Sequence, residues 1–337
     1  MSFRVAVLGA SGYAGGELIR LIDGHDGFDL VYMGAHSHAG SVLGDVHPQL
    51  KKPERPLGGI DAEIDADLVF LALPHGASAK VGFRLTERGL RVVDLGSDFR
   101  LDTPERFEEA YGEAHPVPDQ LGRWVYGLPE LFDCTGADRV ASPGCYPTAV
   151  LLAIAPFLRK GLVSADGLVA DCLSGVSGAG RSLRDEFMFG SVAEGVRAYG
   201  IAGHRHRPEI EMALDSLLGG RHRVTFTPHL VPMQRGLLAT VTAAVVEDSD
   251  GIEDCLSLAY QDAPFVEVID RPPQTRWVVG SNRALVAAFH DGHTGRLIAQ
   301  CAIDNLLKGA AGQAVQAANL MVGYEETTGL PLDGLMP

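Results

Sequence analysis

The sequence has no long apolar run. Among its 337 residues, none of the apolar stretches approaches the roughly 18 uncharged residues that a membrane-spanning helix needs. The stretch from Ala149 to Leu158 contains Pro156 and ends in two basic residues. The N-terminal apolar run is short and leads into a glycine turn, unlike a secretory signal. We therefore expect a cytoplasmic protein without membrane contacts.

Basic residues and cysteines are also few. The chain has 28 Lys and Arg against 43 Asp and Glu, a formal net charge of −15. Nucleic acids and anionic membranes attract positive surfaces, so we expect neither as a partner. The five cysteines form no C-x-x-C pair, which argues against a disulfide framework or a zinc site, and we predict no metal. A cysteine that matters here acts as a thiol.

Short apolar runs alternate with helical segments in the first 100 residues. This alternation predicts an α/β domain whose mostly parallel sheet is covered on both faces. The predicted strands are 3–8, 30–35, 68–73 and 92–95, and the predicted helices are 16–22 and 77–89.

The pattern changes after Cys145. The later strand-like stretches are longer, and they indicate an α+β second domain with a mixed or antiparallel sheet. The predicted strands are 168–173, 223–227, 237–246 and 266–269, and the predicted helices are 149–160 and 304–321.

A glycine-rich turn separates the first predicted strand from the first helix. Its sequence GASGYAG has the spacing G-x-x-G-x-x-G, which departs from G-x-G-x-x-G. Glycines there allow backbone N–H groups to approach a pyrophosphate at a helix start. An ordinary strand–helix turn is the alternative, but the position at the first βα junction favours a dinucleotide. The predicted cofactor-binding residues are Gly9, Ser11, Gly12, Tyr13, Ala14 and Gly15.

The end of the second predicted strand bears on which dinucleotide binds. NAD sites usually place Asp or Glu there, whereas this chain has no carboxylate between the end of that strand at Ala35 and Asp45. Ser37 and His38 suit a 2′-phosphate instead and favour NADP(H), although a plain polar loop is the alternative. A second candidate loop follows the third strand, with a solvated turn as its alternative; its predicted cofactor-binding residues are Pro74, His75 and Gly76.

The motif SPGCYPTA places Cys145 before an apolar run. Pro147 suits a first helical turn, so Cys145 lies at or just before a helix N-terminus. The helix dipole stabilises a thiolate there, which predicts a nucleophile. The alternative is a small buried residue.

A nucleophilic thiol combined with a nicotinamide cofactor implies acyl or aldehyde chemistry, which needs an acid/base group. The glycine-bounded loop around His204 and His206 alternates histidine with arginine. Histidine titrates in the useful range and arginine binds phosphate or carboxylate. A basic solvated turn is the alternative reading of this loop.

Eight motifs in order resemble one family. They are GASGYAGGEL, ALPHGAS, SDFRL, YGLPEL, SPGCYPTA, SGVSGAGR, GHRHRPEI and IDNLLKGAAGQAVQ. From residue 3 to the C-terminus the chain resembles the N-acetyl-γ-glutamyl-phosphate reductases, within the semialdehyde dehydrogenase group. The resemblance implies a doubly wound Rossmann domain of residues 1–145 plus 304–337, completed by a C-terminal helix. It also implies an inserted α+β domain of residues 146–303 for substrate binding and oligomerisation, and a homodimer or homotetramer.

The resemblance implies NADPH-dependent reduction of N-acetyl-glutamyl 5-phosphate to the 5-semialdehyde, with release of phosphate, in arginine biosynthesis. Cys145 matches the nucleophile and His204 the acid/base group, with His206 as the competing assignment. Asn305 is expected beside the nicotinamide. The implied substrate-binding residues are Arg100, Ser177 and Arg207. Gly178 and Tyr199, in the loops that contain Ser177 and the two histidines, are also predicted to bind substrate.

Two alternatives remain open from the sequence. One is a reductase of lysine biosynthesis that acts on N-acyl-aminoadipyl phosphate, one carbon longer. A methylene contributes only about 1–3 kcal/mol of discrimination, so motifs separate the two weakly. The other is an NADP-binding sensor without catalysis, against which the presence of Cys145 and both histidines argues.

Overall fold

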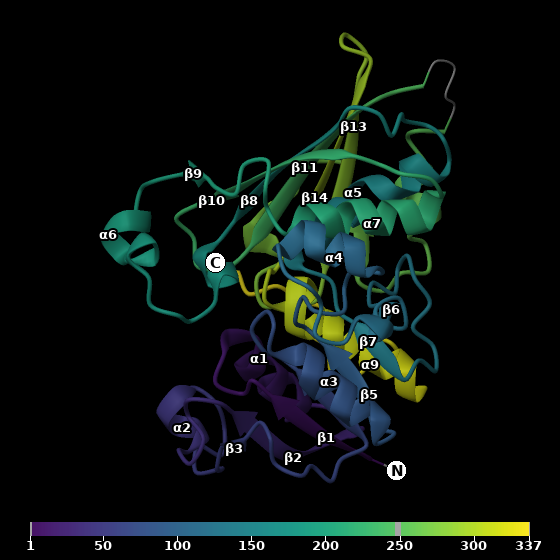
Figure 1. Cartoon of the computed structure of the whole chain (residues 1–337). Coiled ribbons are helices and arrows are strands. Elements are labelled where there is room, and N and C mark those ends of the chain that lie inside the picture. The colour runs from purple at the N-terminus through teal and green to yellow at the C-terminus, as the bar shows by residue number, and fades with distance from the viewer. Residues whose placement is uncertain (1, 247–250, 337) are drawn as a thin grey trace. The chain divides into compact units, whose positions relative to one another are not determined.

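The computed structural model describes residues 2–246 and 251–336. They form two compact units, which are described separately (Figure 1). Unit 1 comprises residues 1–143 and 310–330, and unit 2 comprises residues 144–309 and 331–337.

Unit 1 is built on a parallel sheet of seven strands in the order β3-β2-β1-β4-β5-β7-β6. The sheet confirms the predicted doubly wound type, because the chain runs outward from β1 on one side and from β4 on the other. The strands are β1 (Phe3–Leu8), β2 (Phe28–Ala35), β3 (Gly58–Gly59), β4 (Leu68–Leu71), β5 (Arg91–Asp94), β6 (Val125–Tyr126) and β7 (Arg139–Ala141).

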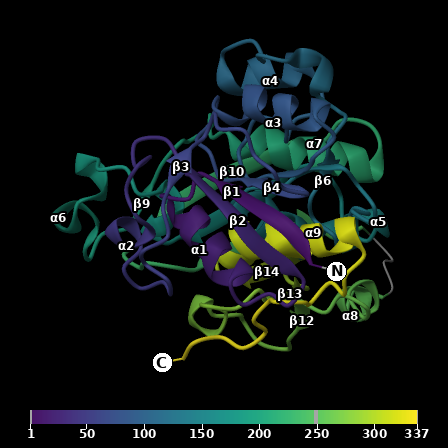
Figure 2. The same ribbon diagram turned by 90° about the horizontal axis from the view of Figure 1, so that it is seen from below.

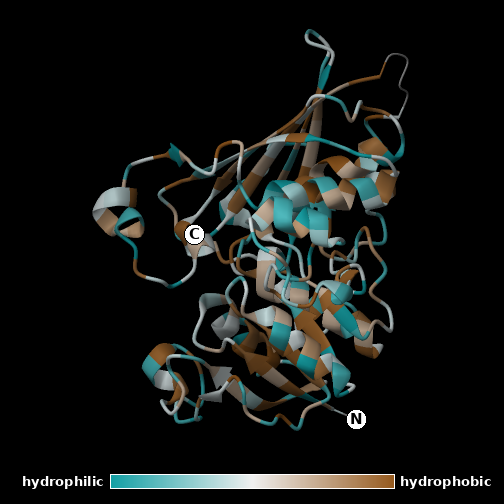
Figure 3. Ribbon diagram, in the orientation of Figure 1, coloured by the Kyte–Doolittle hydropathy of each residue, from teal (hydrophilic) through white to brown (hydrophobic). Residues whose placement is uncertain are grey.

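Apolar strands and amphipathic helices make the core of unit 1. Strand β1 is largely brown in Figure 3, and Leu68 to Leu71 of β4 are all fully buried. The C-terminal helix α9 packs against α1, as Figure 2 also shows, and against β5. The helices are α1 (Tyr13–Ile22), α2 (Leu43–Val46), α3 (Ser78–Glu87), α4 (Pro104–Tyr111) and α9 (Gly312–Val322).

Unit 2 contains a mixed sheet of seven strands in the order β12-β13-β14-β11-β8-β10-β9. The pairs β8–β10 and β12–β13 are parallel and the others antiparallel, which confirms the predicted mixed sheet. The strands are β8 (Leu168–Ser174), β9 (Arg197–Ala198), β10 (Val224–Leu230), β11 (Leu237–Ala244), β12 (Val266–Val268), β13 (Ala284–Asp291) and β14 (Arg296–Ile303).

Helices α5 and α7 pack against each other. Helix α5 also packs against β11, β13 and β14, and α7 packs against β10. Residues 146–158 of α5 are all buried, so this helix is a core element. A π-helical turn, Leu307–Ala311, precedes α9. The helices of unit 2 are α5 (Cys145–Arg159), α6 (Phe189–Val192), α7 (His206–Leu218) and α8 (Cys255–Ala259).

Two expectations about the C-terminal part need correction. Residues 304–309 and 331–337 lie in unit 2, not with the first domain. The buried carboxylate of Asp304 pairs with Arg235 at 3.0 Å and accepts the Gly280 N–H at 2.7 Å. The Leu335 N–H donates to the Val279 carbonyl at 2.7 Å. Both parts are therefore held by unit 2, and the predicted helix 304–321 begins at residue 307 as a π-helical turn.

Across residues 2–246 and 251–336, none of the helices is long and apolar enough to cross a membrane. Over the same residues, no group of three or more His, Cys, Asp or Glu side chains is arranged to hold a metal ion.

Candidate functional site

The glycine turn between β1 and α1 contains glycines with different purposes. Gly9 has a φ of +91°, and a Cβ added to it would lie 2.1 Å from the Ala72 carbonyl oxygen. A Cβ on Gly15 would lie 2.2 Å from the Gly9 carbonyl oxygen, so packing alone requires both glycines. A Cβ on Gly12 would meet nothing closer than 3.5 Å. Packing leaves Gly12 unexplained, whereas close approach of a ligand would explain it.

Gly12 is also the N-cap residue of α1. Because it is a glycine, it has no side chain with which to cap the helix. N–H groups at a helix start bind anions, so the turn has the donors that a pyrophosphate needs. Ser11 and Ala14 are half-buried and Tyr13 is exposed, which places all three at the surface of the turn. These residues fit a dinucleotide.

Ser37 and His38 follow β2 and are exposed. The Ser37 hydroxyl lies 3.1 Å from His38 Nδ1. The first carboxylate after the strand, Asp45, accepts the Val42 N–H at 3.2 Å. The strand end therefore presents two hydrogen-bonding side chains without negative charge, which suits a phosphate better than a ribose diol.

The loop after β4 adjoins the glycine turn, because Ala72 packs against Gly9. Within it, Pro74 and Gly76 are exposed. The His75 ring stacks on Tyr111 with centroids 4.1 Å apart. This histidine is held by its neighbours rather than solvated, unlike the alternative that the sequence left open.

Cys145 is the first residue of α5, four residues before the predicted start of that helix. The preceding Gly144 donates its N–H to the buried Glu209 carboxylate at 2.8 Å, and its carbonyl accepts the Thr148 hydroxyl at 3.0 Å. A Cβ on Gly309 would lie 2.7 Å from the Cys145 Cβ, so the backbone there lies against the thiol residue. Cys145 is part-exposed, while the other four cysteines are buried. The position fits a thiolate stabilised by the helix dipole.

His204 and His206 lie together, with ring centroids 4.9 Å apart. The His206 backbone N–H donates to His204 Nδ1 at 3.2 Å, so neutral His204 carries its proton on Nε2. Burial, with the Arg205 charge as a smaller cause, lowers the pKa of His204 to about 4. His204 is therefore neutral at pH 7 and presents a donor. The sequence suggested a loop at His206, whereas this residue is the first of α7.

Tyr146 links the thiol residue to both histidines. Its ring centroid lies 5.7 Å from that of His204 and also 5.7 Å from that of His206. Its hydroxyl is 3.0 Å from the Tyr199 hydroxyl. Burial raises the pKa of Tyr146, and it raises the pKa of Tyr199 to about 12, so both phenols stay protonated at neutral pH. Sequence reasoning missed Tyr146, although it follows Cys145 directly.

The loop after β8 is fixed by Asn305. The Asn305 side-chain amide donates to the Ser177 hydroxyl at 2.9 Å, and its oxygen accepts the Gly236 N–H at 2.8 Å. Asn305 is only 2% exposed, and both of these hydrogen bonds lie within unit 2. Gly178 is exposed next to Ser177. The expected contact of Asn305 with a nicotinamide stays a prediction.

Two arginines were predicted to bind substrate anions. In unit 1, Arg100 donates to the Ser142 carbonyl at 2.9 Å and to the Leu95 carbonyl at 2.7 Å. In unit 2, Arg207 donates to the Ala202 carbonyl at 2.7 Å. Main-chain carbonyls thus orient both guanidinium groups, and their role toward substrate stays a prediction.

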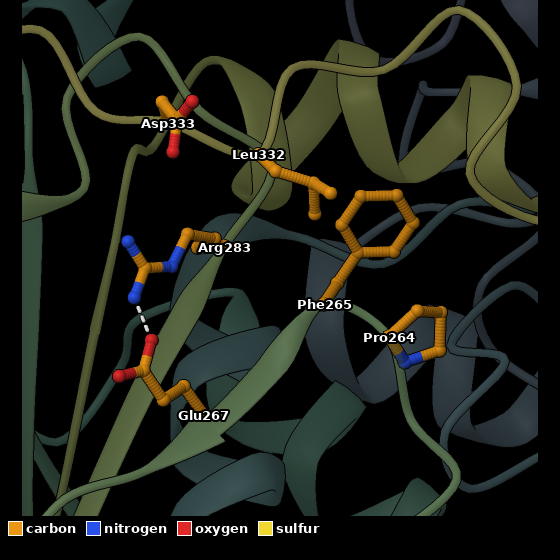
Figure 4. Close-up of a pocket in the computed structure, with 6 residues that line it drawn as sticks. All are labelled: Pro264, Phe265, Glu267, Arg283, Leu332 and Asp333. Atoms are coloured by element: carbon orange, nitrogen blue, oxygen red, sulfur yellow. Dashed lines mark ion pairs between the residues drawn. The ribbon is translucent and has the colours of Figure 1, made fainter.

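A pocket of about 310 Å³ in unit 2 contains none of the predicted site residues (Figure 4). Arg283 pairs with Glu267 there, and Leu332 faces the Phe265 ring. We assign this pocket no part in the chemistry. Its lining residues are Pro264, Phe265, Glu267, Arg283, Leu332 and Asp333.

Known proteins first define the class. The family model described as "Semialdehyde dehydrogenase, NAD binding domain" matches residues 4–135, and "Semialdehyde dehydrogenase, dimerisation domain" matches residues 145–305. Aspartate semialdehyde dehydrogenase II from Vibrio cholerae has a TM-score of 0.74 at 19% identity, covering 96% of this chain and 99% of that chain. The enzyme from Candida albicans, solved with NADP, has a TM-score of 0.68 at 16% identity, with the same coverage. The fold is that of the semialdehyde dehydrogenases.

Curated relatives then narrow the class. N-acetyl-gamma-glutamyl-phosphate reductase from Salinispora tropica is 48% identical over 345 residues, covering 100% of both chains. The protein of the same name from Heliobacterium modesticaldum is 43% identical over 350 residues, covering 99% of both. The chain therefore belongs to the N-acetyl-gamma-glutamyl-phosphate reductase family, which confirms the resemblance and the fold class predicted with it.

Proposed function

We propose that this protein reduces N-acetyl-L-glutamyl 5-phosphate to N-acetyl-L-glutamate 5-semialdehyde, with release of phosphate, as an NADPH-dependent enzyme of arginine biosynthesis. One observation carries the proposal: the part-exposed Cys145 begins α5, and Tyr146 beside it contacts both His204 and His206. A thiolate with a proton carrier is what converts an acyl phosphate to an aldehyde through a thioester. The 48% identity to a full-length relative of that name supports the substrate.

NADP(H) is the cofactor that fits unit 1. Gly12 and the start of α1 suit the pyrophosphate, and Ser37 with His38 suits the 2′-phosphate. When bound, NADPH supplies the hydride that reduces the acyl carbon.

Cys145 carries the acyl group. Its thiolate attacks C5, so a C–S bond forms while the bond from C5 to the phosphate oxygen breaks. A thioester and inorganic phosphate result. After C5 has gained the hydride, its oxygen takes a proton to give a thiohemiacetal. That proton is then removed, the C–S bond breaks, and the aldehyde and the thiolate are released.

We assign proton transfer to His206 and hydrogen-bond donation to His204. A general acid works best with a pKa near the working pH, whereas that of His204 is about 4. Neutral His204 offers its Nε2–H to the developing oxyanion. His206 lies three residues before buried Glu209 on α7, a spacing that puts both on one helix face. This reverses the order of the two histidines that the resemblance implied.

The remaining candidates bind substrate in this scheme. Arg100 and Arg207 take the phosphate and the α-carboxylate, since a guanidinium binds both anions in two-point fashion. Ser177, Gly178 and Tyr199 offer a hydroxyl or an N–H to the carbonyl and acetyl oxygens. The contact of Asn305 with Ser177 holds that hydroxyl in place.

We also propose a homodimer or homotetramer. Residues of β11 are alternately buried and half-buried, so one face of the second sheet is covered less than the other. Figure 1 shows α6 apart from the helices that cover this sheet. Large apolar side chains are exposed on both sides of that helix, and a second copy would cover them. They are Leu183, Met188, Phe189, Val196 and Ile201.

Five free cysteines agree with a reducing compartment, the cytoplasm.

The test is NADPH formation from N-acetyl-glutamate semialdehyde, NADP and phosphate, run beside the homologue with one more carbon. We expect turnover with the glutamate compound and at least tenfold less with the aminoadipate compound. The reverse ratio would favour the lysine enzyme. NADP binding without turnover of either would favour the sensor.

A further inference from the structure

Helix α3 begins without a capping side chain of its own, because its N-cap residue is Ala77. The Ser78 and Ala79 N–H groups donate instead to Oδ2 of Asp98, at 3.1 and 2.9 Å. The Gly76 N–H donates to Oδ1 of the same carboxylate at 2.8 Å. The first N–H groups of a helix have no partner within the helix. A carboxylate 20 residues away in the sequence therefore caps α3.

Asp98 is fully buried, which fixes its position. Phe99 next to it stacks on Trp124 in the core of unit 1, with ring centroids 4.0 Å apart. A buried carboxylate is costly unless it is hydrogen-bonded, and three N–H groups satisfy this one. The SDFRL segment thus presents a rigid acceptor to the loop after β4.

The same carboxylate lies beside the side chain of His75. His75 Nδ1 is 3.1 Å from Asp98 Oδ1 and 2.7 Å from the Ser97 hydroxyl. On the other side of the ring, Nε2 is 3.3 Å from the exposed carboxylate of Glu113. Asp98 and Ser97 therefore hold both the main chain and the histidine of this loop.

The loop lies where a dinucleotide binds in a doubly wound sheet, after β4 and beside the glycine turn after β1. The two helix starts differ. The N-cap residue of α1 is Gly12, which has no side chain to take N–H groups, whereas Asp98 takes the first N–H groups of α3. The anion-binding groups of α3 are therefore already occupied, and the loop before α3 is left to shape the rest of the cofactor site.

We propose that Asp98 is a positioning residue for the cofactor, which acts by fixing residues 74–77 in the conformation that receives NADP(H). This inference rests on the proposed role of unit 1 as the NADP(H) site. Asp98 acts through the loop backbone and His75.

The test is fluorescence titration of NADPH with wild-type protein and with Asp98→Asn. The amide has the shape of the carboxylate, but its NH₂ group faces N–H donors, so the loop loses part of its anchor. We expect the Kd for NADPH to rise at least tenfold. The rate of Cys145 alkylation by iodoacetamide, a readout of unit 2, should not change.

Thr103→Ala is the matched control. The Thr103 hydroxyl caps α4 of the same unit by accepting the Arg106 N–H at 3.2 Å, so this variant also loses a helix cap. It should bind NADPH like the wild type. An unchanged Kd in Asp98→Asn overturns the proposal, and so does an equal loss of affinity in both variants, which would report general destabilisation.

If Asp98→Asn does not fold, Ser97→Ala decides. It removes only the hydroxyl beside His75, and it should weaken NADPH binding about threefold. Unaltered binding in that variant contradicts the proposal. Wild-type protein that binds no NADPH would instead refute the proposed function of unit 1.

Discussion

The two units build their candidate sites from different parts of the chain. Unit 1 uses the main chain, at a turn where Gly12 leaves room for a ligand and the start of α1 offers N–H groups. Unit 2 uses side chains from distant segments, since α5, which begins at Cys145, packs against α7, which begins at His206. The first kind of site is sensitive to added atoms, and the second to the loss of particular chemical groups.

Each unit also holds a buried group whose pKa is strongly shifted, and these two shifts are opposite in direction. Burial, with the nearby charge of Asp98 as a smaller cause, raises the pKa of Asp94 in unit 1 from 3.8 to about 7. Burial lowers the pKa of His204 in unit 2 from 6.5 to about 4. Both groups favour their neutral forms, so their contributions to stability should respond to pH in opposite directions.

The largest effect is expected from Cys145→Ser. The serine hydroxyl is a far weaker nucleophile, so turnover should fall roughly 10³-fold or more. NADPH affinity, a property of unit 1, should stay within about twofold of the wild-type value. Steady-state kinetics and fluorescence titration measure the two quantities. Near-normal turnover would remove Cys145 from the mechanism.

The two histidines sharpen the comparison within unit 2. His206→Asn should lower kcat about 10²- to 10⁴-fold, because it removes the proton carrier. His204→Asn removes a hydrogen-bond donor but leaves the proton carrier in place, so its loss should be at least tenfold smaller. Measurement of kcat for both variants decides. A larger loss in His204→Asn would return the acid/base role to that residue.

The glycine turn separates packing from binding in unit 1. Gly12→Ala should leave the melting temperature nearly unchanged but weaken NADPH binding at least tenfold, because the new Cβ contacts only the Gly9 carbonyl at 3.5 Å. Gly15→Ala should lower the melting temperature by several degrees, because its Cβ would lie 2.2 Å from that carbonyl. Thermal unfolding and titration of both variants test this. A Gly12→Ala protein with wild-type affinity would refute the turn as a binding site.

The pH dependence of stability tests whether the pKa shifts of Asp94 and His204 are opposite in direction. Asp94 has a native pKa above its unfolded value, so its contribution to stability falls as the pH rises from about 4 to about 7. The free energy of unfolding of Asp94→Asn, relative to that of the wild type, should therefore rise by about 2–3 kcal/mol as the pH rises from 5 to 8. His204 has a native pKa below its unfolded value, so stability is lost as the pH falls from about 6.5 to about 4.

The free energy of unfolding of His204→Asn, relative to that of the wild type, should accordingly rise by about 2 kcal/mol as the pH falls from 8 to 5. Urea unfolding of both variants at the two pH values measures these differences. If both variants gained stability in the same direction of pH, the contrast between Asp94 and His204 would be wrong.

The sequence predicted the continuous parts of this structure well. Strands such as Phe3–Leu8 and the glycine turn are local, because an uninterrupted apolar run and fixed glycine spacing define them. Strands β13 and β14 were not predicted. Their alanines have little β propensity, and pairing with β11 and with each other forms them. Helix α7 was not predicted beyond its loop-like start at His206, although Pro208 and Glu209 are typical of a first helical turn.

The site residues divide in the same way. Cys145 and His206 stand in contiguous motifs, so the sequence predicted them as candidates. Glu209 and Asp98 are in two of the same motifs but were given no role. Their partners, the N–H groups of Gly144 and of the α3 start, are 65 and about 20 residues away. Only the folded chain brings such pairs together.

Trapping the acyl-enzyme tests the central claim most directly. Protein without NADPH would be mixed with N-acetyl-glutamyl 5-phosphate, digested at low pH and analysed by peptide mass spectrometry. We predict one N-acetyl-glutamyl group on the peptide that contains Cys145, one phosphate released per site, and loss of the adduct when NADPH is added. Phosphate release or reduction without an adduct on Cys145, or an adduct on another residue, would contradict the account.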